Sequence, residues 1–179
     1  MKSFVRNPFV IGGGIALAVI GFLLFRPDTL VTDVRVSAPL EEAFAASPSE
    51  TTGATVETSA TTTNSSAEAE VVEVSRGTFV GIDHRASGTA TIYSQNDRYV
   101  LRFEDDTDIQ NGPDLYVWVL PSDSYEGSIP AEYLDLGTLT GNVGSQNYQL
   151  PEGFDPELHR TVLIWCLRFA VPFAAAPLT

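Results

Sequence analysis

The chain has 179 residues, and its 10 basic and 23 acidic side chains give a formal net charge of −13. This length suits one folded domain with appendages, and the acidic balance argues against nucleic acid as a partner, because binding to phosphates requires clustered lysine and arginine. A single cysteine, Cys166, excludes an intramolecular disulfide, a paired-cysteine redox motif and a cysteine-rich zinc site.

Residues 1–26 are predicted to form an N-terminal transmembrane signal anchor. Residues 8–25 carry no charge, and residues 9–25 as a helix span roughly 25 Å, near the minimum for a bilayer. Lys2 and Arg6 precede this run, so the positive-inside tendency predicts a cytoplasmic N-terminus and an extracytoplasmic C-terminal domain, periplasmic or extracellular. The alternative is a cleaved signal peptide, but the nearest good cleavage motif, residues 43–45, lies well downstream. We therefore expect a single-pass protein held in membrane lipid by its N-terminal helix.

Residues 27–75 are predicted to be a low-complexity flexible linker. From residue 40 onward this stretch is rich in serine, threonine, alanine and glutamate, and it has few large apolar side chains to offset the entropy of ordering. A coil of about 36 residues has ends roughly 30–35 Å apart on average, so the domain could search a shell near the membrane. Residues 31–36 fit either a short strand or an interfacial segment.

Residues 76–179 are predicted to form the folded domain, because here the hydrophobic pattern acquires a period of two. Residues 98–104 alternate Tyr99, Leu101 and Phe103 on one face with charged side chains on the other, as a half-buried strand does. Further strands are expected at residues 78–82, 89–93, 115–120 and 161–171, with weaker signals at 134–139 and 147–150. Turn residues separate these segments, and the predicted fold is an all-β antiparallel β-sandwich or jelly-roll-like domain.

The last predicted strand carries Cys166. If residues 161–173 are one continuous strand, Arg168 lies on the same face as Cys166. A neighbouring cation favours a reactive thiolate, whereas burial among apolar groups opposes it. Cys166 and Arg168 are the candidate catalytic pair, and the alternative is that Cys166 is a packed core residue, since free cysteine packs as a small hydrophobe.

Other polar residues give weaker indications of chemistry. An acidic run at residues 104–108, followed by residues 111–114, offers oxygen ligands for calcium, but its spacing departs from the EF-hand and lacks the closing glutamate. His84 and His159 cannot make a closed zinc site unaided, although carboxylates could complete one. No nucleophile elbow and no phosphate-binding glycine loop is present. We therefore assign no metal and no cofactor, and we do not expect a stand-alone enzyme.

A series of short motifs runs through residues 76–179 in a fixed order. These motifs are Gly77-Thr78-Phe79, His84 with Ser87-Gly88-Thr89-Ala90, Leu101-Arg102-Phe103-Glu104, Asn111-Gly112-Pro113-Asp114-Leu115-Tyr116-Val117, Leu136-Gly137-Thr138-Leu139 with Gly141, Gly144 with Tyr148-Gln149-Leu150-Pro151, and Val162-Leu163-Ile164-Trp165-Cys166 with Phe169. In this order and spacing they resemble the DM-thirteen domain family, which is named for electron transfer and is sometimes found beside DOMON haem-binding domains.

The resemblance implies a compact β domain, often extracellular, whose characteristic cysteine falls on Cys166 and takes part in a redox relay. The sequence shows no DOMON domain, and its only methionine is Met1, so a Met/His haem site within the domain is excluded while His84 and His159 stay candidate axial ligands. A donor and an acceptor of electrons would then belong to other chains.

Together these patterns predict a membrane-anchored, extracytoplasmic accessory module that transfers electrons or exchanges thiols through Cys166 with an envelope protein partner. The alternative is a noncatalytic binding module of the cell envelope, in which Cys166 is packed and loops such as residues 105–114 meet a protein, glycan or cation.

Overall fold

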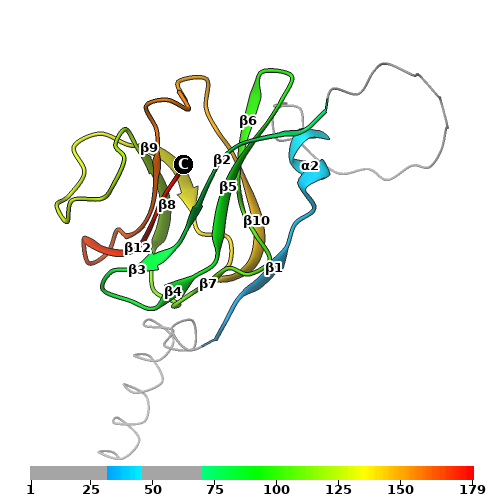
Figure 1. Ribbon diagram of the computed structural model, residues 1–179. Helices are drawn as coiled ribbons and strands as arrows, with labels where there is room; N and C mark the ends of the chain where they lie inside the picture. Colours follow the sequence, from blue (N-terminus) through cyan, green and yellow to red (C-terminus); the bar gives the residue numbers. More distant parts are fainter. Residues whose placement is uncertain (1–31, 46–69) are drawn as a thin grey trace, which may run out of the picture.

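The computed structural model describes residues 32–45 and 70–179, and in these ranges the chain forms two β-sheets that pack face to face and nearly close into a barrel (Figure 1). The prediction of an all-β antiparallel sandwich is thereby confirmed. No helix in the described ranges is long and apolar enough to cross a membrane. The predicted anchor, residues 8–25, lies outside the described residues.

The larger sheet has seven strands in the order β2-β5-β6-β10-β7-β4, with β1 added beside β10. All of its pairings are antiparallel except the parallel pairing of β1 with β10. The strands are β1 (Arg35–Ser37), β2 (Val72–Thr78), β4 (Ala86–Ser87), β5 (Thr89–Gln95), β6 (Arg98–Phe103), β7 (Asp108–Ile109) and β10 (Val143–Gln149).

The smaller sheet has five antiparallel strands in the order β3-β12-β11-β8-β9. They are β3 (Val80–Gly81), β8 (Leu115–Leu120), β9 (Leu134–Thr138), β11 (Thr161–Cys166) and β12 (Val171–Pro177). The central strand is β11, and all six of its residues are buried. The predicted strands at residues 98–104, 115–120, 134–139 and 147–150 therefore correspond to β6, β8, β9 and β10.

The main core lies between the two sheets, and a second apolar cluster covers the outer face of the smaller sheet. The alternation along β11 divides its side chains between these clusters, because successive residues of a strand point to opposite faces. Cys166 points into the main core with Val162 and Ile164, whereas Leu163 and Trp165 belong to the outer cluster.

The sheets approach each other where β2 runs beside the end of β12. The backbone groups of Arg76 and Thr179 exchange two hydrogen bonds of 3.1 and 2.9 Å. Gly77 makes this approach possible, since a Cβ atom there would lie 2.1 Å from the carbonyl oxygen of Pro177.

Residues 32–45, which we call the strap, lie along the flank of the larger sheet (blue in Figure 1). The strap comprises β1 and the short helix α2 (Leu40–Ala45), which contacts β6 and β10. Gly144, at a φ of 94°, admits β1, because a Cβ atom there would lie 2.1 Å from the carbonyl oxygen of Val36. The folded part therefore takes in residues that we had placed in the linker: the strap and the first residues of β2, which begins at Val72.

The prediction of one long final strand is wrong, because the chain turns back after Cys166. The ladder between β11 and β8 ends at the pair of Cys166 and Leu115, and residues 167–170 form a tight turn into β12. Ala170 takes a φ of 52° to complete this turn. The turn contains no glycine, proline or asparagine, so the sequence carries none of the usual signals for it.

Candidate functional site

Cys166 lies where the central strand of the smaller sheet ends. Its side chain has an exposed fraction of 0%, and its Sγ donates a hydrogen bond of 3.1 Å to the carbonyl oxygen of Pro113. This contact holds the sulfur as an S–H donor within the core. The next four residues are all exposed, so the thiol lies at the boundary between the packed core and a surface turn.

Arg168 does not lie beside Cys166 on one strand face, as the sequence had suggested, because it belongs to the turn. Its Nε donates a hydrogen bond of 2.9 Å to the Oδ2 of Asp114, and both side chains are about half exposed. The guanidinium is therefore engaged with a carboxylate in the segment that also holds the thiol. The pairing of Cys166 with Arg168 as catalytic residues stays a prediction, and in this conformation the link between them runs through residues 113 and 114.

Residues 111–114, which we call the thiol loop, are shaped by their own polar groups and by Phe173. The Oδ1 of Asn111 accepts a hydrogen bond of 2.9 Å from the amide of Gly112. A Cβ atom at Gly112 would lie 2.5 Å from the Phe173 ring, so glycine allows the loop to pass directly over that ring. Asp114 has a φ of 53°, a conformation that costs most residues roughly 1–2 kcal/mol.

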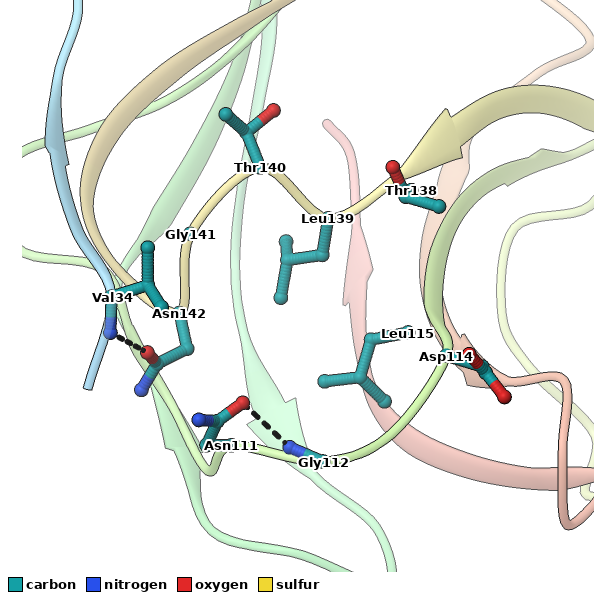
Figure 2. A pocket seen from close by; sticks show the side chains of 10 residues that line it. All are labelled: Val34, Asn111, Gly112, Asp114, Leu115, Thr138, Leu139, Thr140, Gly141 and Asn142. Atoms are coloured by element: carbon teal, nitrogen blue, oxygen red, sulfur yellow. Dashed lines mark hydrogen bonds between the residues drawn. The ribbon is translucent and has the colours of Figure 1, made fainter. Parts of the chain in front are cut away.

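The thiol loop forms one wall of a cleft of about 230 Å³, shown in Figure 2. The opposite wall is the segment that joins β9 to β10, and Val34 of the strap closes one side. Leu115 and Leu139 point into the cleft (Figure 2). Ten residues line it: Val34, Asn111, Gly112, Asp114, Leu115, Thr138, Leu139, Thr140, Gly141 and Asn142. A small, partly apolar cleft with convergent polar groups suits a small ligand or a protruding side chain of a partner.

A buried polar network fixes the far wall of this cleft. Gln146 has an exposed fraction of 2%; its Oε1 accepts hydrogen bonds from the amides of Thr140 and Gly141 and from the Tyr148 hydroxyl, at 3.1, 3.2 and 2.6 Å. Its Nε2 donates to the carbonyl oxygen of Gly141 at 2.7 Å. Burial raises the pKa of the Tyr148 hydroxyl, and the hydrogen bond from the Thr140 amide partly opposes that rise. The Gln146 side-chain amide thus binds the backbone of Thr140 and Gly141 and holds this wall of the cleft in place.

In residues 104–108, which we call the acidic loop, Glu104, Asp106 and Asp108 use their carboxylates for hydrogen bonds and ion pairs within the domain. The two carboxylate oxygens of Asp106 accept hydrogen bonds of 3.0 and 2.9 Å from the amide and hydroxyl of Thr89. Glu104 accepts from Tyr93 and from Arg102, and Asp108 pairs with Arg85 at 3.3 Å. In residues 32–45 and 70–179 no three histidine, cysteine, aspartate or glutamate side chains gather as metal ligands.

The two histidines lie at opposite ends of β12. His84 stacks on Phe173 with ring centroids 3.7 Å apart, near the start of that strand. His159 is buried, and its Nδ1 accepts a 3.0 Å hydrogen bond from the Asp155 amide. It lies two residues before Thr161, which pairs with Pro177 at the end of β12. Phe173 and Pro177 are four residue steps apart along the strand, roughly 13 Å at the usual rise. The two imidazoles therefore do not share one iron as axial ligands.

A stack of three aromatic rings on the outer face of the smaller sheet was not expected from the sequence. Trp118 lies between Tyr133 and Trp165, with ring centroids 3.9 and 5.2 Å away and interplanar angles of 17° and 19°. The sequence named Trp165 as a strand residue, but the stack depends on the β8–β9 connection folding back over the sheet. It stabilises the side of β11 that faces away from the thiol.

Comparison with known proteins identifies the folded part. A family model described as electron transfer DM13 matches residues 78–178, which is more than half of the chain. No curated protein and no solved structure matches the chain.

Proposed function

The chain belongs to the DM13 family of electron-transfer domains, and on this premise we propose that its β domain is a redox module that works through Cys166. We further propose that residues 8–25 anchor it in a membrane and that the domain meets an envelope protein on the extracytoplasmic side. Under this proposal the module is an accessory to a partner and not a stand-alone enzyme.

The observation that carries the proposal is the position of the chain's only cysteine at the junction of a buried strand and an exposed turn. The turn is closed by the Arg168–Asp114 pair, both members of which are about half exposed. Exposed pairs contribute only about 0–1 kcal/mol. Asp114 and Ala170, on either side of the thiol, both adopt positive φ values, 53° and 52°. A weak ion pair and the strained backbone of Ala170 favour local opening at this place over opening elsewhere along β11.

Opening of the turn would permit thiol–disulfide exchange. The Cys166 thiol gives its proton to solvent, and the thiolate attacks one sulfur of a disulfide in the partner. A Cys166–partner S–S bond forms, the partner's S–S bond breaks, and the second partner sulfur leaves as a thiolate that takes up a proton. The Cys166 sulfur is oxidised and the leaving sulfur is reduced. Cys166 is the only cysteine of the sequence, so the thiol that resolves the mixed disulfide comes from the partner.

Alkylation of the full chain in membranes tests this role. We expect slow reaction of Cys166 with a maleimide when the protein is alone, because the sulfur is buried. Envelope extract whose disulfides have been reduced should speed the reaction, because a bound partner opens the turn without consuming the thiol. Extract with oxidised partner proteins should instead consume the thiol in a mixed disulfide and lower the labelling. Trapping should then yield a mixed disulfide that dithiothreitol cleaves and that Cys166→Ala does not form. Unchanged labelling with every envelope extract, together with full function of Cys166→Ala, would end the redox proposal.

A binding module is the second candidate, and the cleft beside the thiol loop favours it. The thiol is then a packed core residue, consistent with its complete burial and its hydrogen bond to Pro113. Thr138→Trp would fill the cleft from an exposed position without touching Cys166. Loss of partner capture in this variant, with Cys166→Ala unaffected, would favour the binding module, and the reverse result would favour the redox module.

A further inference from the structure

We infer that the strap holds the thiol-loop end of the domain toward the membrane and that the turn at residues 167–170 rests on the outer lipid surface. This inference depends on the proposed membrane anchor and adds an orientation to it. It concerns the surface around Cys166, and it identifies the side from which a partner reaches the thiol.

The first residues of the strap are bound at the thiol-loop end. The Nδ2 of Asn111 donates a hydrogen bond of 2.7 Å to the carbonyl oxygen of Thr32. The amide of Val34 donates a hydrogen bond of 2.6 Å to the Oδ1 of Asn142. Asn111 is two residues from Pro113, whose carbonyl oxygen accepts the hydrogen bond from the Cys166 thiol. The chain thus enters the domain beside the thiol.

The rest of the strap is fixed along the sheet mainly through its backbone. Arg102 donates to the carbonyl oxygen of Ala38 at 2.7 Å, and Asn147 donates to that of Pro39 at 2.8 Å. Further along, the carbonyl oxygens of Ala43 and Phe44 accept hydrogen bonds from side chains of β6 and β10. With the parallel pairing of β1 and β10, these contacts prevent the strap from serving as a free tether.

The length of chain before the strap limits how far the thiol-loop end can move from the membrane. Six residue steps separate Arg26, the end of the predicted anchor, from Thr32. A fully extended chain covers at most about 3.6 Å per residue, which gives roughly 20 Å. A compact domain of this size has a radius of gyration of roughly 13 Å and is therefore about 35 Å across. The thiol-loop end stays near the lipid, in contrast to the wide search that a free linker would allow.

The turn after Cys166 presents apolar side chains at this end of the domain. Leu167 and Phe169 have exposed fractions of 52% and 64%. The amide of Leu167 donates to the carbonyl oxygen of Asp114, so the turn is joined directly to the thiol loop. The one charge in the turn, Arg168, is compensated by Asp114. Aromatic and aliphatic side chains on a turn without net charge favour the boundary of headgroups and acyl chains, and the short tether keeps their local concentration high.

The orientation restricts the kind of partner that can use Cys166. If the turn rests on lipid, a freely diffusing periplasmic or extracellular protein meets the opposite end of the domain first. A protein embedded in the same membrane reaches the turn by lateral diffusion and can displace it from the lipid. The redox partner is therefore an integral membrane protein whose disulfide lies close to the outer lipid surface.

Depth-dependent fluorescence quenching tests the orientation. The full chain with Cys166→Ala and Phe169→Cys is labelled with an environment-sensitive fluorophore and reconstituted in phosphatidylcholine vesicles that contain headgroup-quencher lipids. The matched control places the cysteine at Glu152, an exposed residue just beyond the other end of β10. We expect a blue-shifted emission and strong quenching at position 169, and weak quenching at position 152.

A tether variant decides whether the strap causes the orientation. Twenty glycine and serine residues inserted between Asp28 and Thr29 leave the described residues unchanged, and we expect them to reduce quenching at position 169 to the level of position 152. Equal quenching at the two positions without the insertion would overturn the inference. Failure of the full chain to float with vesicles would show that residues 8–25 are not a membrane anchor, and the inferred orientation would fall with the anchor. The redox role is tested separately, by thiol exchange in solution.

Discussion

The acidic loop and the thiol loop are neighbours in the sequence, and both drew attention through their polar residues, yet the fold uses them differently. In the acidic loop, Asp106 and Glu104 direct their carboxylates at neighbouring strands, so their hydrogen bonds close the fold. In the thiol loop, the Asp114 carboxylate reaches across 54 residues to the turn beside the cysteine. One loop stabilises the structure, whereas the other covers the buried Cys166 thiol and borders a cleft.

This difference shows that the side-chain type alone does not locate a site. A carboxylate that accepts hydrogen bonds from neighbouring residues of the domain is already satisfied, and its removal lowers the free energy of unfolding. A carboxylate in an exposed ion pair adds little stability, but it can control whether a turn opens. Substitutions should therefore separate stability from thiol access, and the following predictions test that separation in order of decreasing effect.

The largest effect is expected at Gln146, which holds the cleft wall opposite the thiol loop. Gln146→Ala removes the acceptor of the buried Gly141 amide and of the Tyr148 hydroxyl, and each unsatisfied buried group costs about 1–3 kcal/mol. The Thr140 amide also loses this acceptor but keeps the Tyr148 hydroxyl as a second one. We expect the free energy of unfolding to fall by about 3 kcal/mol, measured by urea denaturation. Gln110→Ala, at an exposed glutamine, is the control and should cost less than about 0.5 kcal/mol.

The next effect concerns the acidic loop. Asp106→Ala removes both acceptors of Thr89, and we expect a loss of about 1–1.5 kcal/mol because hydrogen bonds to a charged group are stronger than neutral ones. The rate at which a maleimide reaches Cys166 should stay that of the unsubstituted protein under native conditions. A large increase in that rate would show that the two loops open together and would remove the distinction between them.

A smaller change in stability, with a larger change in access, is expected for Arg168→Ala. The side chain is about half exposed, and its ion pair with Asp114 is worth less than about 1 kcal/mol. We expect thiol labelling to become several-fold faster, because the ion pair that holds the turn to the thiol loop is lost. The matched control is Arg85→Ala, which breaks an exposed pair with Asp108 in the acidic loop and should leave labelling unchanged. Equal rates in the two variants would exclude Arg168 as a control of thiol access.

Much of the sheet structure was predictable because local pattern and packing agree. The alternation in residues 98–104 places Leu101 and Phe103 in the core and Arg102 on the opposite face, as β6 shows. There the strap covers Arg102, whose side chain is 11% exposed. Alternation also placed Cys166 on the same strand face as Val162 and Ile164, and the structure shows that this face packs into the main core. Family resemblance then gave the identity of the domain, because its motifs extend over most of residues 78–178.

The parts that were missed depend on contacts distant in sequence. The strap has few large apolar residues, and it is ordered by side chains such as Arg102 and Asn147, which bind its backbone carbonyl oxygens from 64 and 108 residues away. The turn after Cys166 lacks turn residues, and it exists because β12 pairs with β11 and β3. The contact of Arg168 with Asp114 requires that turn, so strand alternation assigned Arg168 to the wrong neighbour.

The smallest effect is expected from calcium, and it bears most directly on the acidic loop. Both oxygens of Asp106 and both oxygens of Glu104 accept hydrogen bonds from the chain, so a cation at the loop would have to displace Thr89, Tyr93 or Arg102. A site with a Kd of 0.1 mM would add about 1.4 kcal/mol at 1 mM calcium, which would raise Tm by several degrees in a domain of about 100 residues. We expect a shift below about 1 °C, with magnesium at equal ionic strength as the control for charge screening. A rise of several degrees with calcium alone, lost in Asp106→Asn, would make the acidic loop a binding site and reverse the roles assigned to the two loops.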